Sequence, residues 1–257
     1  MGIVVLKYQN NFADNLSELA YAKILEANSE KQCYFENSIT KRQNFEYKMS
    51  NFNMDYKYIS TNQVKSIAEK SYLFSRKLVN PNKITKEFQN NNKYNKILDV
   101  NHFKIDDIDL ITDNIKEQFN FKNTDFIVNF DILDEINSVN SIGVYINKND
   151  LAYLDYDYLY NAANRLNKYL RKPKLFIFTN KINIDENNLN LKYKTLNLLD
   201  WREEFYFLTR CKNKIIIPTL NSYSENFWSA ILNKSTNLVA YDKNIKAKKF
   251  AQNWIGI

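Results

Sequence analysis

The chain has 257 residues, 44% of them apolar and 25% charged, a composition that excludes wholesale disorder and leaves room for two modest domains or one large one. Its formal net charge of +7 favours anionic partners such as phosphate-bearing ligands, but the scattered lysines form no basic helix or repeated basic-aromatic motif, which argues against nucleic acid. The sequence lacks a CxxC pair, a secretory apolar segment and the roughly 20 apolar residues of a transmembrane helix, so we expect a cytoplasmic protein with at most peripheral membrane contact.

The N-terminal residues predict a strand, a helix and a second strand. Residues 3–6 form a short apolar run typical of a buried strand, and residues 33–35 form another. Between them, apolar residues recur at helical spacing over residues 16–27, with Asp14 or Asn15 placed to cap the helix. This order of elements is that of a parallel α/β sheet.

The middle of the chain is harder to assign. Residues 38–100 show no clear periodicity, and we expect short helices and loops there. Residues 105–121 place apolar side chains on one helical face and an acidic cluster in the first turn, where the helix dipole favours carboxylates. A solvated helix start explains this cluster more simply than a metal site does.

The second half repeats the α/β order more cleanly, after a break near residues 125–141. Short apolar runs predict strands, and apolar stripes at helical spacing predict helices between them. We expect strands at residues 142–146, 175–178, 191–199, 215–217 and 238–241, and helices near residues 159–170, 205–208 and 227–232. Two α/β halves are the simplest architecture.

Several segments, read in order, resemble the bacterial α-1,2-fucosyltransferases of glycosyltransferase family 11. NNFADNLSELAYAKIL (residues 10–25) is similar to the family's GGLGNQLFQYAFAKAL, YINKNDL (145–151) to its H-I-R-R-x-D-Y signature, and IFTNK (177–181) to its IFSDD. FYFLTRCKNKIIIPTLNSYSENFWSAIL (205–232) is similar to the family's LALMSLCKHNII-NSSFSWWGAWL. Residues 98–121, 158–163 and 234–241 resemble further family segments in the same order.

The resemblance implies an α/β, GT-B-like fold, in which two Rossmann-like domains face each other across a cleft. Residues 1–135 would form the N-terminal acceptor-side domain, and residues 136–257 the C-terminal domain that binds the sugar nucleotide. The implied reaction is an inverting, metal-independent transfer of a sugar to a hydroxyl of a surface-glycan precursor, an oligosaccharide or glycolipid. The family's usual donor, GDP-fucose, makes a GDP-sugar the expected donor substrate, with no other cofactor.

An inverting transfer without a metal must stabilise the charge on the departing diphosphate with cationic side chains and N–H groups at a helix start. The turn at residues 221–226 lies where the family places such a start, although Ser222 or Ser224 could equally be a simple N-cap. Glu225 is expected to point away from the site. The resemblance assigns catalysis to Lys148 and Asp150, the acceptor side of the cleft to Asp14 and Asn15, and donor binding to Tyr145, Asn147, Thr179, Asn180, Ser222, Ser224 and Asn226.

The signature segment departs from the family pattern. Tyr145, Asn147 and Lys148 stand where the family has a histidine and two arginines, and Lys148 lacks the bidentate fork of a guanidinium. A catalytically inactive relative, acting as a glycan-binding or scaffold subunit, is therefore the alternative hypothesis. Asp155 or Asp157 could serve as a general base or as a helix cap.

Overall fold

The computed structural model describes part of the chain, in stretches separated by gaps. These stretches are residues 2–6, 12–28, 31–37, 49–55, 57–60, 62–63, 96–98, 110–147, 151, 154–179, 182–217, 224–233, 237–243 and 253–257. By its internal contacts the chain divides into two compact units, Met1–Lys122 and Asn123–Ile257. Within the described stretches, no helix is long and apolar enough to span a membrane.

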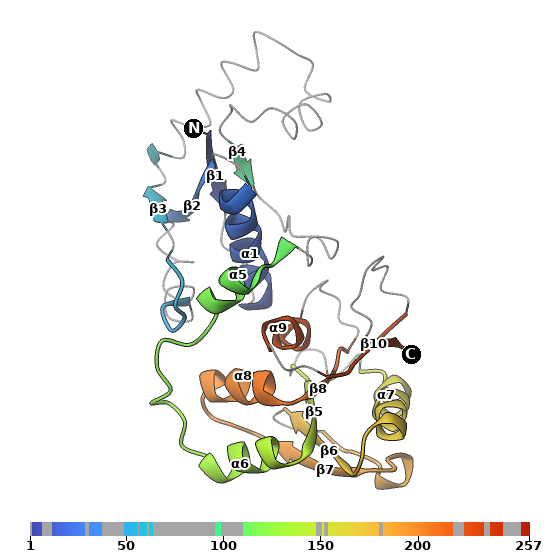
Figure 1. The fold of residues 1–257 in the computed structure, drawn as a ribbon. Helices are drawn as coiled ribbons and strands as arrows, with labels where there is room; N and C mark the ends of the chain where they lie inside the picture. Colours follow the sequence, from blue (N-terminus) through green and yellow to red (C-terminus); the bar gives the residue numbers. More distant parts are fainter. Residues whose placement is uncertain are drawn as a thin grey trace. The chain divides into compact units, whose positions relative to one another are not determined.

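The first unit is built on a four-stranded parallel sheet in the order β3-β2-β1-β4 (Figure 1). Its elements are β1 (Gly2–Leu6), α1 (Phe12–Asn28), β2 (Lys31–Asn37), β3 (Lys57–Ser60), β4 (Lys96–Leu98) and α5 (Asp113–Gln118). The predicted start of strand, helix and strand is confirmed. Most of residues 38–100, where the sequence predicts short helices and loops, lie outside the described stretches.

Helix α1 begins earlier than the sequence predicts. Leu16 and Leu19 are fully buried, in agreement with the predicted apolar stripe. The helix starts at Phe12, however, so Asp14 and Asn15 lie inside its first residues, and Asn15 is buried. The prediction that one of them caps the helix is therefore wrong. Phe12 is itself buried, and its packing extends the helix toward the N-terminus.

Helix α5 is shorter than the predicted span of residues 105–121. Its N-cap is Thr112, whose Oγ1 accepts a hydrogen bond from the Ile115 N–H at 3.4 Å, and this cap starts the helix at Asp113. The acidic cluster predicted in its first turn lies outside the described stretches. Beyond the helix, the rings of Phe121 and Phe52 lie 4.6 Å apart across an antiparallel bridge.

The second unit has a six-stranded parallel sheet in the order β10-β9-β8-β5-β6-β7 (Figure 1). Its elements are α6 (Phe130–Ser138), β5 (Asn140–Tyr145), α7 (Tyr156–Tyr169), β6 (Pro173–Phe178), the 3-10 turn η4 (Glu186–Asn188), β7 (Lys192–Leu196), α8 (Trp201–Arg210), β8 (Asn213–Ile215), α9 (Glu225–Leu232), β9 (Val239–Tyr241) and β10 (Trp254–Gly256). This is the strand order of a doubly wound Rossmann sheet, with its reversal between β5 and β8. Two successive α/β units, each on a parallel sheet, confirm the predicted α/β fold class.

The side chains of β5 alternate between the two faces of this sheet. Ile142 and Val144 belong to a buried cluster that also contains Leu159 and Ala162 of α7. Gly143 faces the opposite side, where the C-terminal end of α8 packs. Helix α7 therefore covers one face of the sheet and α8 the other (Figure 1).

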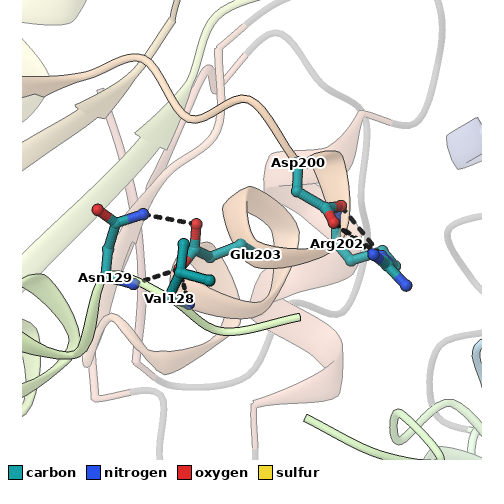
Figure 2. A network of polar contacts seen from close by, with 5 residues as sticks. All are labelled: Val128, Asn129, Asp200, Arg202 and Glu203. Atoms are coloured by element: carbon teal, nitrogen blue, oxygen red, sulfur yellow. Dashed lines mark hydrogen bonds and ion pairs between the residues drawn. The ribbon is translucent and has the colours of Figure 1, made fainter. Parts of the chain in front are cut away.

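The division between the units falls earlier than the predicted boundary after residue 135, because α6 is attached to α8. Buried Glu203 accepts hydrogen bonds at Oε1 from the backbone N–H of Asn129 and of the residue before it, both at 2.8 Å (Figure 2). Its Oε2 accepts from Asn129 Nδ2 at 2.7 Å. At the opposite end of α6, Lys212 Nζ donates to two carbonyl oxygens at 2.8 Å. Both ends of α6 are thus held by the second unit.

The C-terminal end of α8 lies very close to β5, since a Cβ added to Gly143 would be 2.8 Å from Cys211 Cβ and 2.9 Å from its Sγ. The last carbonyls of the helix are satisfied inside the protein. Buried Lys214 donates from Nζ to Leu208 O and, at 2.5 Å, to Cys211 O, and Asn233 Nδ2 donates to Cys211 O at 2.9 Å. Burial lowers the pKa of Lys214 to about 8 and raises that of the Cys211 thiol to about 11, which makes the thiol unreactive at neutral pH.

We expect Gly143→Ala to lower the free energy of unfolding by about 1–3 kcal/mol, because the new methyl group would overlap Cys211. The control is Gly256→Ala at an exposed position. Its added Cβ would lie 3.3 Å from the nearest atom, the Cβ of Lys243. That variant should change stability by less than about 0.5 kcal/mol. Urea unfolding of both variants measures the difference, and equal effects would contradict the close packing of α8 on β5.

Candidate functional site

The strand order places the candidate site at the carboxyl edge of the second sheet, between β5 and β8. In open α/β sheets, ligands bind outside the carboxyl ends of the strands at the point where the strand order reverses. Here β5 pairs with β8 only through Ile142 with Asn213 and Gly143 with Lys214. β5 continues to Tyr145, so the two strands are no longer paired where they reach this edge.

The side chain of Asn226, in the first turn of α9, connects these elements. Its Oδ1 accepts a hydrogen bond from the Tyr145 N–H at 2.5 Å, and its Nδ2 donates to Tyr145 O at 2.6 Å. The amide therefore occupies the place that a neighbouring strand would take beside β5. Asn226 is only 1% exposed, so this contact fixes the start of α9 against the end of the strand.

The N-terminus of α9 has the properties of an anion site. Ser224 is the N-cap, with an extended backbone, and the first helical bond runs from the Trp228 N–H to Ser224 O at 3.1 Å. The N–H groups of the first turn and the positive end of the helix dipole point outward from here. The Ser224 hydroxyl makes no capping bond, although the residue is only 8% exposed and its Oγ is buried without a partner among the described residues. A ligand oxygen at the helix start would satisfy it.

A second buried hydroxyl without a partner lies at the same edge. Thr179 follows β6 directly, its N–H donates to Leu196 O at 2.9 Å, and it is only 2% exposed. Its Oγ1 has no hydrogen-bond partner in the part of the chain that the structure describes. Since β6 is the neighbour of β5, this hydroxyl and Asn147, two residues after β5, both follow the carboxyl ends of adjacent strands.

Two acidic residues lie in the first turns of the helices α8 and α9. Glu204 lies in the first turn of α8, and Glu225 is the first residue of α9. Burial, and secondarily the charge of Glu225, raise the pKa of Glu204 to about 7. Whether Glu225 points away from a bound ligand, as the sequence predicts, stays a prediction. The sequence prediction missed Glu204, which belongs to no motif. The signal that could have found it is its position four residues before the buried Leu208, on the same side of an amphipathic helix.

The structure gathers five of the predicted donor-binding residues at the carboxyl edge of the second sheet: Tyr145, Asn147, Thr179, Ser224 and Asn226. For Asn226 the predicted role needs a correction, because both polar atoms of its buried amide bond to the Tyr145 backbone.

The remaining predicted residues are less informative. Lys148, Asp150, Asn180 and Ser222 lie outside the described stretches, and Asp14 and Asn15 belong to the first unit.

The other candidates have structural explanations. Asp155 is the N-cap of α7 and accepts a hydrogen bond from the Tyr158 N–H at 2.9 Å, which favours the capping role over that of a base. The Tyr158 hydroxyl in turn donates to Ile216 O at 2.8 Å and ties α7 to the end of β8. In the described part of the chain, no group of three or more histidine, cysteine and acidic side chains is placed to hold a metal ion.

A pocket of about 260 Å³ lies in the first unit, beside the later half of α1 and the first residues of β2. Two of its charged side chains bond to each other and to the backbone. Lys23 Nζ donates to Glu26 Oε2 at 3.2 Å and to Asp55 O at 2.6 Å, and Glu26 Oε1 accepts from the Cys33 N–H at 3.0 Å. Because it adjoins the amino end of β2, this pocket is at the opposite edge from that where ligands bind in such sheets.

Comparisons with known proteins identify no family. No protein-family model and no curated protein matches the chain. One solved structure is similar, the Escherichia coli heptosyltransferase WaaC with ADP-2-deoxy-2-fluoro heptose, at 10% identity and a TM-score of 0.36. The similarity covers 100% of this chain and 93% of that one. A likeness this distant identifies neither a ligand nor an activity.

Asn226→Asp should destabilise the second unit. A carboxylate cannot donate to Tyr145 O, and it would bury a charge where the amide was fully bonded, so we expect a loss of about 2–4 kcal/mol of unfolding free energy. Asn161→Asp, the same change at an exposed position of α7, should cost less than about 0.5 kcal/mol. Chemical denaturation measures both, and a mild effect of Asn226→Asp would mean that the contact does not hold α9.

Glu204→Gln should stabilise the protein at alkaline but not at acidic pH. The raised pKa means that the folded state binds more protons than the unfolded state between about pH 4.5 and 7, so stability falls as pH rises through this window. The neutral glutamine removes that loss. We expect a gain of about 1–3 kcal/mol at pH 8 and almost none at pH 4. Unfolding at both pH values tests this, and a gain that did not depend on pH would contradict it.

Proposed function

We propose that the chain is a glycosyltransferase whose second unit binds a sugar nucleotide, with the diphosphate at the start of α9. The observation that carries this proposal is the buried Ser224 hydroxyl, which lacks a partner at the N-terminus of α9 beside the end of β5. A helix start with an unsatisfied donor, at the reversal point of a Rossmann sheet, suits a diphosphate better than it suits a neutral ligand.

The same geometry suits the chemistry of glycosyl transfer. When an acceptor hydroxyl attacks the anomeric carbon, the bond to the diphosphate breaks and the leaving group takes the electron pair. The outward N–H groups of α9 and the Ser224 hydroxyl can stabilise the charge that develops on the leaving oxygen. Lys148 and Asp150, which follow β5 in the sequence, are the proposed cation and proton acceptor.

The finer assignment rests on the resemblance to glycosyltransferase family 11. It favours inversion at the anomeric carbon, fucose from GDP-fucose as the transferred sugar, and a hydroxyl of a surface-glycan precursor as acceptor. In this proposal the first unit contributes the acceptor side, with Asp14 and Asn15 near the beginning of α1. Contact with a membrane surface would be peripheral and would serve a glycolipid acceptor.

An inactive, glycan-binding relative is the second candidate function. It is favoured by Tyr145, Asn147 and Lys148, which stand in place of the histidine and arginines of the family signature. The two candidates differ in turnover: release of GDP from GDP-fucose with an acceptor glycan supports the enzyme, and binding of glycan without release supports the subunit.

A thermal-shift panel with GDP, UDP, dTDP and CMP tests the proposed donor site. At about 100 times its dissociation constant, a diphosphate should raise the melting temperature of the wild type by roughly 5–10 °C. Ser224→Ala should melt no lower than the wild type without ligand, because the hydroxyl has no partner to lose. It should nevertheless show a clearly smaller ligand shift.

Asp155→Ala is the matched control, because it removes an N-cap that does accept a hydrogen bond. It should lower stability by about 1 kcal/mol and leave the ligand shift intact. No shift of the wild type with any diphosphate, or an undiminished shift in Ser224→Ala, would refute the site at α9.

A further inference from the structure

Thr179 carries the second buried hydroxyl at the carboxyl edge of the second sheet. The residue is only 2% exposed, and its Oγ1 makes no hydrogen bond to any residue that the structure describes. Burying an unpaired hydroxyl costs free energy, and a valine of nearly the same shape would avoid that cost. Because this hydroxyl lies at the edge where ligands bind in such sheets, it is a candidate contact for a ligand.

The end of β5 lies between Thr179 and the start of α9. On the side of β6, the Ile146 N–H donates to Phe178 O at 2.9 Å, and Thr179 is the next residue along that chain segment. On the side of β8, the backbone of Tyr145 bonds to the Asn226 amide in the first turn of α9. Thr179 and the start of α9 therefore flank the same strand end.

Thr179 and α9 also belong to opposite faces of the sheet. Leu175 and Ile177 of β6 lie in the buried cluster under α7. The Thr179 N–H donates to Leu196 O and continues the pairing with β7, so the alternation of side chains gives Thr179 the same face as Ile177. Helix α9 packs against α8, which covers the other face. A ligand that contacts both sides passes over the end of β5, and a nucleotide is long enough to do so, whereas a lone phosphate is not.

The two helix starts at this edge differ in the charge that they favour. Helix α7 leads from β5 to β6 and therefore begins at the carboxyl edge, on the face of Thr179. Its start already holds the Asp155 carboxylate, which accepts from the Tyr158 N–H, and Asp157 adds a second negative charge in the first turn. Phosphate oxygens are disfavoured beside these carboxylates and favoured at the start of α9. The partner of Thr179 is therefore a neutral group.

We propose that Thr179 is a specificity-determining residue of the donor site, whose hydroxyl bonds to a neutral polar group of the nucleoside or the sugar while the diphosphate lies at the start of α9. This inference rests on the proposed function, which places the diphosphate there. A hydroxyl both donates and accepts, so it can recognise a hydroxyl, an amide or a ring nitrogen of the ligand. The contact adds affinity for a nucleotide and none for pyrophosphate.

Isothermal titration of the full chain with inorganic pyrophosphate, GDP and GDP-fucose tests this inference. Thr179→Val removes the hydroxyl and keeps the shape of the side chain. It should bind pyrophosphate as tightly as the wild type does, and the nucleotide about three- to tenfold more weakly. A loss with GDP assigns the contact to the nucleoside, and a loss with GDP-fucose alone assigns it to the sugar. If UDP binds more tightly than GDP, UDP and UDP-glucose replace this pair.

The matched control is Thr195→Val, the same change at an exposed position of β7, which should bind all the ligands as the wild type does. Thr179→Ser keeps a hydroxyl and should retain most of the nucleotide affinity. Without ligand, Thr179→Val should melt no lower than the wild type, because its hydroxyl has no partner to lose among the described residues.

An unchanged nucleotide affinity in Thr179→Val would overturn the inference and leave the anion site at α9 standing. An equal loss of pyrophosphate affinity would overturn it as well, because Thr179 would then contact the diphosphate. If the wild type binds none of these ligands, the donor site itself is refuted, and this inference falls with it.

Discussion

The paired hydrogen bonds between the Asn226 amide and the Tyr145 backbone hold the carboxyl edge of the second sheet together. β5 and β8 stop pairing after Gly143 and Lys214, so the backbone of Tyr145 takes its partner on that side from a helix instead of a strand. The same amide anchors the first turn of α9. The place of the N-terminus of α9, and of the Ser224 hydroxyl beside it, therefore follows from this one contact.

Charged side chains at helix ends hold α6 and α8 in place on the second unit. Glu203 accepts from the N–H groups at the start of α6, and Lys212 donates to the carbonyls at its end. Lys214 does the same, inside the core, for the last carbonyls of α8. Each charge lies at the helix end whose dipole favours it. Helix α8 in turn packs against α9.

The buried hydroxyls at the candidate site stand out against these satisfied groups. Thr112, Asp155 and Asp200 all accept a hydrogen bond from the helix that they cap. Ser224 has the same position on α9 and a side chain that is equally able to cap, yet its hydroxyl makes no such bond. A buried donor without a partner lowers the stability of the folded state. The unfavourable burial of the Ser224 hydroxyl is explained if a bound ligand supplies the missing partner.

The sequence by itself determined the alternation of strands and helices, because the apolar runs at β1, β5 and β6 and the apolar stripes of α1 and α7 are local patterns that any α/β fold must bury. It also pointed to the turn before α9. Only the tertiary structure decided where α1 and α5 begin and that α6 belongs to the second unit, since these depend on packing and capping between distant residues. The role of Asn226 was equally beyond the sequence, because it lies 81 positions along the chain from its partner Tyr145.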